Sequence, residues 1–378
     1  AALALKKIME RERIPGTIVL WPGVAEELVA AKAWFVRDGW FKDVDAVFFT
    51  HVGNDLSVTW GAASGTGLVS AEFVFTGESA HSAGSPWRAR SALDAVELMN
   101  IAWNYRREHL RPDQRSHYVI SDGGDQPNVV PPRAAVWYYI REIEYPDIKR
   151  NFETAIRIAE GAAKMTDTEV SYRILGTAWP RHFNKVIAEA MHKHIRTVGM
   201  PEWTEDDQTL ARAVQKEVSA ENARGLSLRV DTTLQGPQRS SGGSDDIGDI
   251  SWVAPTITLR FPSNIPGLPG HNWSSAIAMA TPIAHKGATA GAKVMARTAL
   301  EMFLTPKTVE DAWTYFRDVQ TKETKYTPFI DSDDPPAVWL NTEIMREFKP
   351  KLLPFYYDET KFNTYLEQLG IRYPTVRR

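Results

Sequence analysis

The sequence has no cysteine, no long apolar run and little net charge. Without cysteine, disulfide bonds and thiolate metal sites are excluded, so any metal ion must be held by histidine, aspartate or glutamate. No apolar run reaches the roughly 18 residues that a membrane-spanning helix requires. A net charge of -3 gives no electrostatic argument for nucleic-acid binding. With 43% hydrophobic and 24% charged residues the chain is globular, and its 378 residues predict about two domains.

The chain also lacks an ordinary N-terminal start. It begins with Ala1, and the segment AALALKKIME has the pattern of an amphipathic helix without a capping residue. A natural start or a secretory signal peptide would look different. We therefore expect a fragment of a longer protein, with any targeting signal encoded upstream. The expected location is cytoplasmic.

The first 68 residues alternate between helix and strand patterns. The helices are predicted at 1–13 and 27–38, and the strands at 17–20 and 46–50. Glu26, Glu27 and His51 follow the ends of the two strands. Ligands gather at the carboxyl ends of strands in open α/β sheets, so these three residues are candidates for a site.

Residues 69–180 are predicted as a separate unit with the order β-α-β-β-α-β. Its elements are predicted at 71–76, 87–109, 116–120, 134–141, 145–165 and 168–175. This order is typical of ferredoxin-like domains. The simplest interpretation is an α+β module inserted into an α/β domain.

After this unit the helical patterns return. Helices are predicted at 182–198, 205–221 and 275–303. A polar stretch at 236–248 and a predicted strand at 256–261 lie between the second and third of these helices. A loop rich in proline and glycine ends at His271. We therefore predict that residues 1–68 and 181–378 form one domain, interrupted by residues 69–180.

Singly, the candidate residues have ordinary explanations. Adjacent carboxylates such as Glu26 and Glu27 repel each other unless a cation lies nearby, but glutamate is also favoured at the start of a helix. A histidine at a strand end, such as His51, is more often structural than functional. His271 stands in PGHNWS, between a glycine-rich loop and a helix. The order and spacing of the four together are harder to explain by chance.

Six motifs spread over nearly the whole chain carry a family resemblance. They are AEELVAAK at Glu26, DAVFFTHVG at His51, TGESAHSAG at His81, GGDQPNVVPPRAAVWYYIRE from Gly123, GSDDIGDISWVAPT from Gly243 and PGHNWS at His271. Together they resemble the metal-dependent amidohydrolases that include aminoacylases, carboxypeptidase G, hippurate hydrolase and plant indole-acetyl-amino-acid hydrolases. The resemblance implies an α/β fold, with a mixed-sheet two-metal hydrolase domain and an inserted ferredoxin-like α+β domain for dimerisation and as a lid.

The resemblance also implies roles for individual residues. Glu26 would be the general base, taking a proton from a metal-bridging water and passing it to the leaving amine. Glu27, His51 and His271 would be metal ligands. This ligand set suits Zn²⁺ and Mn²⁺ alike, so two divalent ions of either kind are expected. Asp246 would lie just behind the ligands.

Three residues of the inserted unit would contact the substrate. His81 matches the family histidine that reaches the site of a neighbouring subunit and stabilises the tetrahedral oxyanion, which implies a homodimer. Asn128 and Arg141 match the family pair that holds the substrate carboxylate, and a guanidinium group can bind a carboxylate in two places. Ordinary surface roles for His81 and Arg141 stay open at this point.

One part of the family pattern is missing. The family has a Cys-x-His pair, or an equivalent, about ten residues upstream of the first residue of this chain, and it supplies the bridging ligand and one more. We therefore expect at most half of each metal site here, and an inactive fragment of an active enzyme.

The leading hypothesis is hydrolysis of the amide bond of an N-acyl or N-aroyl amino acid. The stretch SDDIGDISW and the total layout most resemble members of this family that act on aminobenzoyl-glutamate, and this resemblance implies a substrate of that kind. A dipeptidase or other exopeptidase of the same fold is an alternative, because the acyl pocket is set by shape rather than by a motif. A non-catalytic binding member is another, but it would need broken ligands, and the four candidate site residues are intact.

Overall fold

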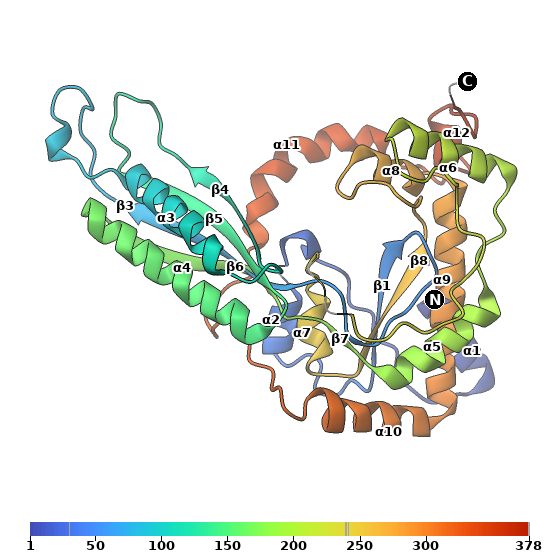
Figure 1. Cartoon of the computed structure of the whole chain (residues 1–378). Helices are drawn as coiled ribbons and strands as arrows, with labels where there is room; N and C mark the ends of the chain where they lie inside the picture. The colour runs from blue at the N-terminus through green and yellow to red at the C-terminus, as the bar shows by residue number, and fades with distance from the viewer. Residues whose placement is uncertain (30, 239, 241, 377–378) are drawn as a thin grey trace.

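The computed structural model describes residues 1–29, 31–238, 240 and 242–376. Figure 1 shows an elongated arm attached to a broader body. The arm contains a four-stranded sheet and two long helices. The body contains a parallel pair of strands surrounded by helices. No described helix is long and apolar enough to cross a membrane.

The arm has the β-α-β-β-α-β connectivity that the sequence predicts. Its four strands are antiparallel and lie in the order β4-β5-β3-β6. In chain order its elements are β3 (Gly67–Thr76), α3 (Ala92–Arg106), β4 (Arg115–Asp122), β5 (Arg133–Glu142), α4 (Tyr145–Thr166) and β6 (Glu169–Ala178).

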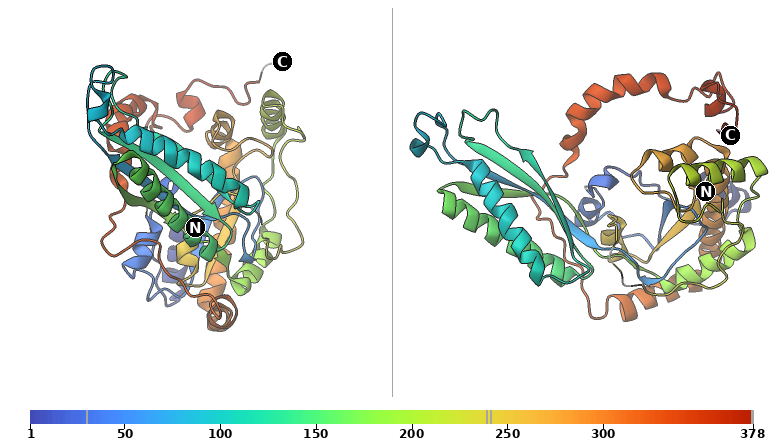
Figure 2. Two further views of the ribbon diagram at one scale, coloured as in Figure 1. Left: turned by 60° about the vertical axis from the view of Figure 1, so that its left-hand side comes forward. Right: turned by 45° about the horizontal axis from the view of Figure 1, so that its top comes forward.

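Alternation along the strands gives this sheet a covered face and an open face. Figure 2 shows both helices on the covered face, where the core of the arm contains the β3 residues Val69, Ala71, Phe73 and Phe75. The open face carries half-buried residues of β5: Trp137, Tyr139 and Arg141. The fold therefore leaves aromatic and charged side chains of one strand available to the rest of the molecule.

The body is organised around β1 (Val47–Gly53) and β8 (Thr256–Pro262), which pair in parallel. Parallel strands end at the same edge, so the segments that follow both strands start from one place. The surrounding helices are α1 (Ala2–Glu12), α2 (Lys32–Arg37), α5 (Lys185–Val198), α6 (Glu205–Glu217), α7 (Ile247–Ser251), α9 (Pro282–Leu304) and α10 (Pro306–Tyr315). The largest core of the body includes Ile187, Ile257, Leu259 and Val294.

Three of the predicted elements are wrong. The expected strand at 17–20 is an exposed segment without strand structure, because no described strand lies beside it to pair its backbone. The expected helix at 27–38 is a 3-10 turn, Glu26–Leu28, followed by the shorter α2. The expected helix at 275–303 is two helices, α8 (Trp273–Met279) and α9, because Pro282 has no N–H for a continuous helix.

Another boundary shifts for a local reason. The predicted helix at 182–198 begins at Lys185, where the Asn184 side chain caps the first backbone N–H groups. Before it, β7 (His182–Phe183) pairs with β2 (Gly61–Ala62). The predicted helix at 87–109 is the shorter α3, with a separate 3-10 turn at Pro86–Arg88 and another at Arg107–His109. The remaining helices and strands match their predicted positions to within a few residues.

The C-terminal segment runs from the body to the arm and then returns to the body. After α10 it forms a π-helical turn, Phe316–Gln320, and reaches the arm, where the short helix Val338–Asn341 lies near β6. Figure 1 then shows α11 (Thr342–Leu352) arching back toward α8 and α12 (Tyr365–Gln368). The segment closes where the Tyr373 hydroxyl donates to Asp207 at 2.8 Å.

Candidate active site

Glu26 and Glu27 lie on a short 3-10 turn, Glu26–Leu28, which we call the glutamate turn. The two residues that flank it have left-handed backbone conformations. Ala25 has a φ of 50° and Val29 a φ of 47°. A positive φ is uncommon outside glycine and strained for a β-branched residue such as valine. Such strain clusters at functional sites and persists only where the surrounding structure enforces it.

The open face of the arm holds this turn in place. Thr177 in β6 donates its backbone N–H to the Val29 carbonyl at 2.9 Å. The neighbouring residue, Gly176, has no side chain, and a Cβ atom there would collide with the Leu28 carbonyl oxygen. Leu28 also packs against a small buried cluster formed by Leu175 of the same strand and Ala337. The arm therefore contributes directly to the position of the two glutamates.

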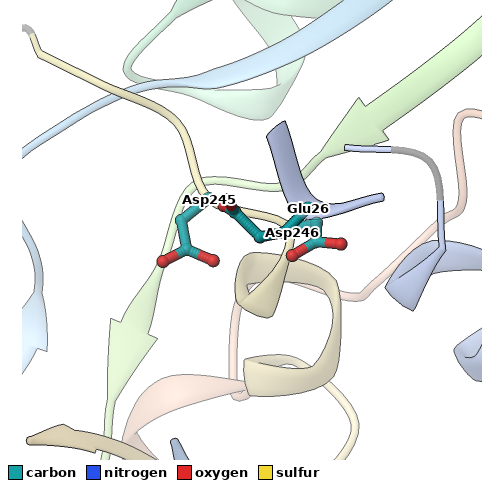
Figure 3. Close-up of side chains that lie close together, drawn as sticks. All are labelled: Glu26, Asp245 and Asp246. Atoms are coloured by element: carbon teal, nitrogen blue, oxygen red, sulfur yellow. The ribbon is translucent and has the colours of Figure 1, made fainter. Parts of the chain in front are cut away.

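The loop before α7 brings two buried aspartates, Asp245 and Asp246, to Glu26. We call this segment the acidic loop. One carboxylate oxygen from each of Glu26, Asp245 and Asp246 lies within 4.8 Å of the others. Figure 3 shows the three side chains close together. Burial, followed by the charges of Asp245 and Glu27, raises the pKa of Glu26. Burial also raises the pKa of Asp246 to about 7. Three full negative charges are therefore unfavourable here unless cations lie close by.

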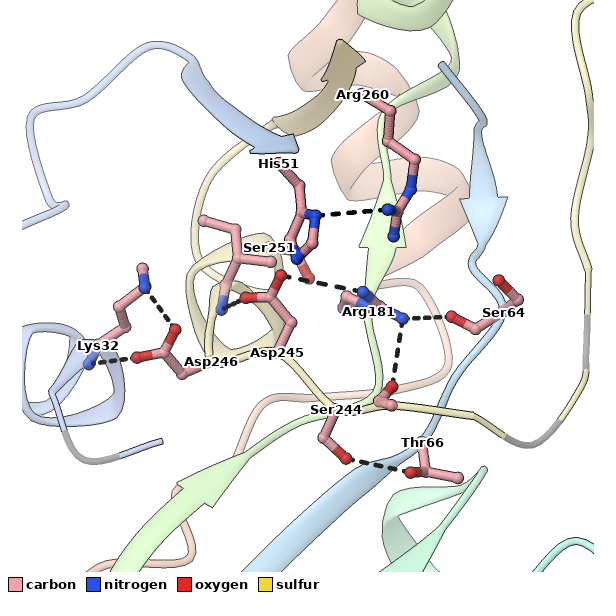
Figure 4. A network of polar contacts seen from close by, with 12 residues as sticks. Lys32, His51, Ser64, Thr66, Arg181, Ser244, Asp245, Asp246, Ser251 and Arg260 are labelled. Carbon is pink, nitrogen blue, oxygen red and sulfur yellow. Dashed lines mark hydrogen bonds and ion pairs between the residues drawn. The ribbon is translucent and has the colours of Figure 1, made fainter. Parts of the chain in front are cut away.

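Two largely buried cations face this acidic group (Figure 4). Lys32, at the start of α2, pairs its ammonium group with one oxygen of Asp246, and its backbone N–H lies 3.4 Å from the other oxygen. Arg181, which follows β6, lies 3.9 Å from Asp245 and donates to the carbonyl of Ser64. Each aspartate thus has its own cation.

Asp249 in α7 ties this loop to two other parts of the chain. Its fully buried carboxylate accepts the backbone N–H of Trp179 at 3.0 Å and the hydroxyl of Tyr326 at 2.9 Å. Burial raises the pKa of Asp249 to about 7. The acidic loop is therefore anchored to the end of β6 and to the C-terminal segment.

His51 lies near the carboxyl end of β1, as predicted, and is exposed. Its Nδ1 lies 2.7 Å from the carbonyl oxygen of Val52, and the guanidinium group of Arg260 lies 3.4 Å from the same nitrogen. The shorter contact requires Nδ1 to carry the proton. The lone pair is then on Nε2, the arrangement in which a histidine can bind a metal ion.

His271 and Glu27 come together across the chain. The His271 Nε2 lies 3.8 Å from Glu27 Oε2, and both side chains are exposed. His271 has a φ of 51°, another left-handed backbone. Within the described residues, the group of three with the spacing of metal ligands is Glu26, Asp245 and Asp246, so His51 does not join Glu27 and His271 in one tight cluster.

His81 lies in the loop between β3 and α3, and Asn128 in the loop between β4 and β5. Both loops extend to the end of the arm that points away from the body (Figure 1). The two residues stand on neighbouring loops, where the Ser82 N–H donates to the Asn128 carbonyl at 3.0 Å. The His81 Nδ1 accepts the N–H groups of Ala83 and Gly84, both at 3.1 Å. The proton of a neutral His81 is therefore on Nε2, which is free to act as a donor to an oxyanion.

Arg141 lies at the other end of β5, beside the acidic loop. Its Nη1 donates to the Ser244 hydroxyl at 3.0 Å, and its guanidinium group lies 5.1 Å from the centre of the Tyr139 ring. Its Nε is buried and has no partner. The eight residue steps from Arg133 to Arg141 span roughly 27 Å of strand. Asn128 precedes Arg133, so Asn128 and Arg141 of one chain lie at opposite ends of β5, although the family resemblance pairs them at one carboxylate.

Several residues of this site were not singled out by sequence reasoning. They are Lys32, Arg181, Ser244, Asp245 and Asp249. The run SDDIGD was a usable signal for the two further aspartates, because clustered carboxylates in an apolar context require counter-charges. No local pattern identifies their cations, since Lys32 and Asp246 are 214 residues apart.

Two comparisons with known proteins concern the fold. The profile of a peptidase dimerisation domain matches residues 65–165, which covers most of the arm. A solved structure of an aminobenzoyl-glutamate utilization protein from Klebsiella pneumoniae superposes with a TM-score of 0.54, at 18% identity, over 79% of this chain and 66% of that chain. The structural superposition supports the α/β fold with its arm.

Curated relatives are hydrolases. The chain is 32% identical to a p-aminobenzoyl-glutamate hydrolase polypeptide of Escherichia coli (strain K12), over 80% of this chain and 68% of the relative. It is 25% identical to the mouse Xaa-Arg dipeptidase over 82% of this chain and 65% of that protein. It is 28% identical to the indole-3-acetyl-aspartic acid hydrolase of Enterobacter agglomerans over 54% of this chain and 50% of that protein. The chain thus spans about two thirds of the length of the first two.

The close approach of Gly176 to the glutamate turn gives a stability prediction. In Gly176→Ala, the new Cβ meets the Leu28 carbonyl oxygen, so we expect a loss of about 1–3 kcal/mol in the free energy of unfolding, measured in urea. Gly161→Ala is the matched control, because nothing lies within 4 Å of that position in α4, and it should stabilise by about 0.5–1 kcal/mol. Equal stabilities of the two variants would contradict the docking of the turn on β6.

Proposed function

Because this chain belongs to the amidohydrolase and peptidase family that includes p-aminobenzoyl-glutamate hydrolase, we propose that it hydrolyses the amide bond of an N-acyl or N-aroyl amino acid. An aminobenzoyl-glutamate-like compound is the proposed substrate. The proposed reaction takes place where the glutamate turn, the acidic loop and the carboxyl ends of β1 and β8 meet.

The observation that carries this proposal is the different surroundings of two adjacent glutamates. Glu26 is half-buried against the acidic loop, whereas Glu27 is exposed and faces His271. Adjacent carboxylates in different environments take different chemical roles. Glu27 is oriented for a ligand role, and Glu26, whose pKa is raised by burial, is suited to accept and return a proton.

The side chains present fit a divalent metal centre. Carboxylate and imidazole donors are what Zn²⁺ and Mn²⁺ prefer, and the contact of His51 with Val52 leaves its Nε2 with a lone pair. Glu27, His51 and His271 would hold the metal ions, and Asp246 would stand behind them. When bound, such ions lower the pKa of a water molecule and polarise the amide carbonyl.

The protein residues then have defined tasks. Glu26 would take the proton of the attacking water and give it to the nitrogen of the leaving amino acid. Arg141 would bind the carboxylate of that amino acid through the edge of its guanidinium group that Ser244 does not occupy. His81 of the partner subunit would donate from Nε2 to the oxyanion, because the β3–α3 loop that carries His81 extends away from α2 and α7 of its own chain. Asn128 of the partner subunit would arrive with it, which completes the carboxylate pair in a homodimer.

A dipeptidase activity is the second candidate. The relative named Xaa-Arg dipeptidase matches as much of this chain as the aminobenzoyl-glutamate hydrolase does, although at lower identity. The chemistry at Glu26 would be the same, and only the group in the acyl position would differ.

Substrate class is tested by Arg141→Ala with a panel of aminobenzoyl-glutamate, hippurate, an acetyl-amino acid and a dipeptide. A charge-assisted bond to a carboxylate contributes roughly 1.5–3 kcal/mol, so kcat/KM should fall about 10- to 150-fold for these compounds. It should change little for carboxamide analogues. Arg157→Ala, an exposed arginine on the helix α4, is the control and should leave kcat/KM unchanged.

Equal rates on carboxylate and carboxamide versions, unaffected by Arg141→Ala, would remove the basis for an acyl-amino acid substrate. A clear preference for the dipeptide would support the second candidate and leave the metal chemistry in place.

Action in trans is tested by mixing inactive His81→Ala subunits with inactive Glu26→Gln subunits. A mixed two-fold dimer has one site with both defects and one site with neither. Statistical mixing should therefore restore about a quarter of the wild-type activity. A confirmed heterodimer without any recovered activity would exclude the trans role of His81.

A further inference from the structure

The ion pair between Lys32 and Asp246 is unusually buried. The Lys32 side chain is 10% exposed and that of Asp246 is 0% exposed. Removing two charges from water costs several kcal/mol per ion, and buried pairs can often be replaced by apolar residues without loss of stability. Stability alone is therefore a poor reason for this pair, and its position suggests another.

Lys32 contacts two elements that carry site residues. Its ammonium group binds Asp246 in the acidic loop and lies 5.1 Å from the centre of the Phe49 ring in β1, two residues before His51. Its backbone N–H points to the second oxygen of Asp246. One residue therefore fixes the acidic loop relative to the strand with the candidate ligand.

The acidic loop in turn forms one side of the surroundings of Glu26. Asp245 and Asp246 each have a cation, whereas the described part of the chain shows no ion pair for Glu26. Like charges held at a fixed place keep the Glu26 carboxylate from turning back into the loop. If the loop moved, Glu26 would lose the group that limits where its carboxylate can lie.

We propose that Lys32 is a positioning residue for the reaction at Glu26: by holding Asp246, it fixes the acidic loop against which the Glu26 carboxylate stands. The inference rests on the proposed function, because it assigns Lys32 a task in that reaction. In this assignment Lys32 acts through Asp246, not by contact with the substrate. Its effect should therefore be on kcat rather than on KM.

The test compares Lys32→Met, Asp246→Asn and the double variant in the full-length protein, with aminobenzoyl-glutamate as the probe. In Lys32→Met, kcat should fall about 10- to 100-fold, the scale of a misplaced catalytic group, while KM changes by less than about threefold. The urea midpoint of the metal-free protein should fall as well, because Asp246 is left buried without its partner.

The double variant separates positioning from folding. With both charges removed, the urea midpoint of the metal-free protein should return close to that of the wild type, while kcat stays low. Recovery of kcat together with stability would show that the pair only supports the fold. Unchanged kcat in Lys32→Met would overturn the proposal directly.

Lys286→Met is the matched control, because Lys286 pairs with the fully buried Asp207, a partner of Tyr373 at the C-terminal end. It should lower the urea midpoint without lowering kcat, and an equal loss of kcat would overturn a specific role for Lys32. Glu26→Gln, measured in parallel, distinguishes the two proposals. Normal turnover in Glu26→Gln would overturn the proposed function, whereas lost turnover there with normal turnover in Lys32→Met would overturn only the role of Lys32.

Discussion

Three carboxylates within 4.8 Å of one another must be kept together, and much of the structure is arranged to do so. Lys32 and Arg181 pair with the two buried aspartates, while Trp179 and Tyr326 anchor Asp249 in α7, the helix that follows this loop. These partners come from α2, from the end of β6 and from the C-terminal segment. Because the buried carboxylates require charged or hydrogen-bonding partners, they connect parts of the chain that are far apart in sequence.

The partners of the buried carboxylates also link the arm to the body. β6 supports the glutamate turn through Thr177 and leads directly into Trp179 and Arg181, which hold the acidic loop. Arg141, on the neighbouring open face, reaches the loop through Ser244. The near end of the arm is thus part of the site of its own chain, whereas its tip, with His81, is placed for the proposed contact with the partner subunit.

The arm was predictable from sequence because its strands alternate clearly and its helices are long. The strand at 17–20 was not, since an apolar run becomes a strand only where another strand pairs with it. The separation of Asn128 from Arg141 could have been inferred, because the sequence places a full strand between them. The partners of Asp245 and Asp246 could not, because their ion pairs depend on how distant segments pack.

Metal content is the most direct test of the division of roles between Glu26 and Glu27. The full-length protein and its Glu26→Gln and Glu27→Gln variants would be saturated with Zn²⁺ or Mn²⁺, freed of unbound ions and analysed for bound metal and for turnover. We predict that Glu26→Gln retains its metal and loses roughly 100-fold or more in turnover, the scale of general-base catalysis. Glu27→Gln should lose metal. Loss of metal from Glu26→Gln, with metal retained in Glu27→Gln, would contradict the account.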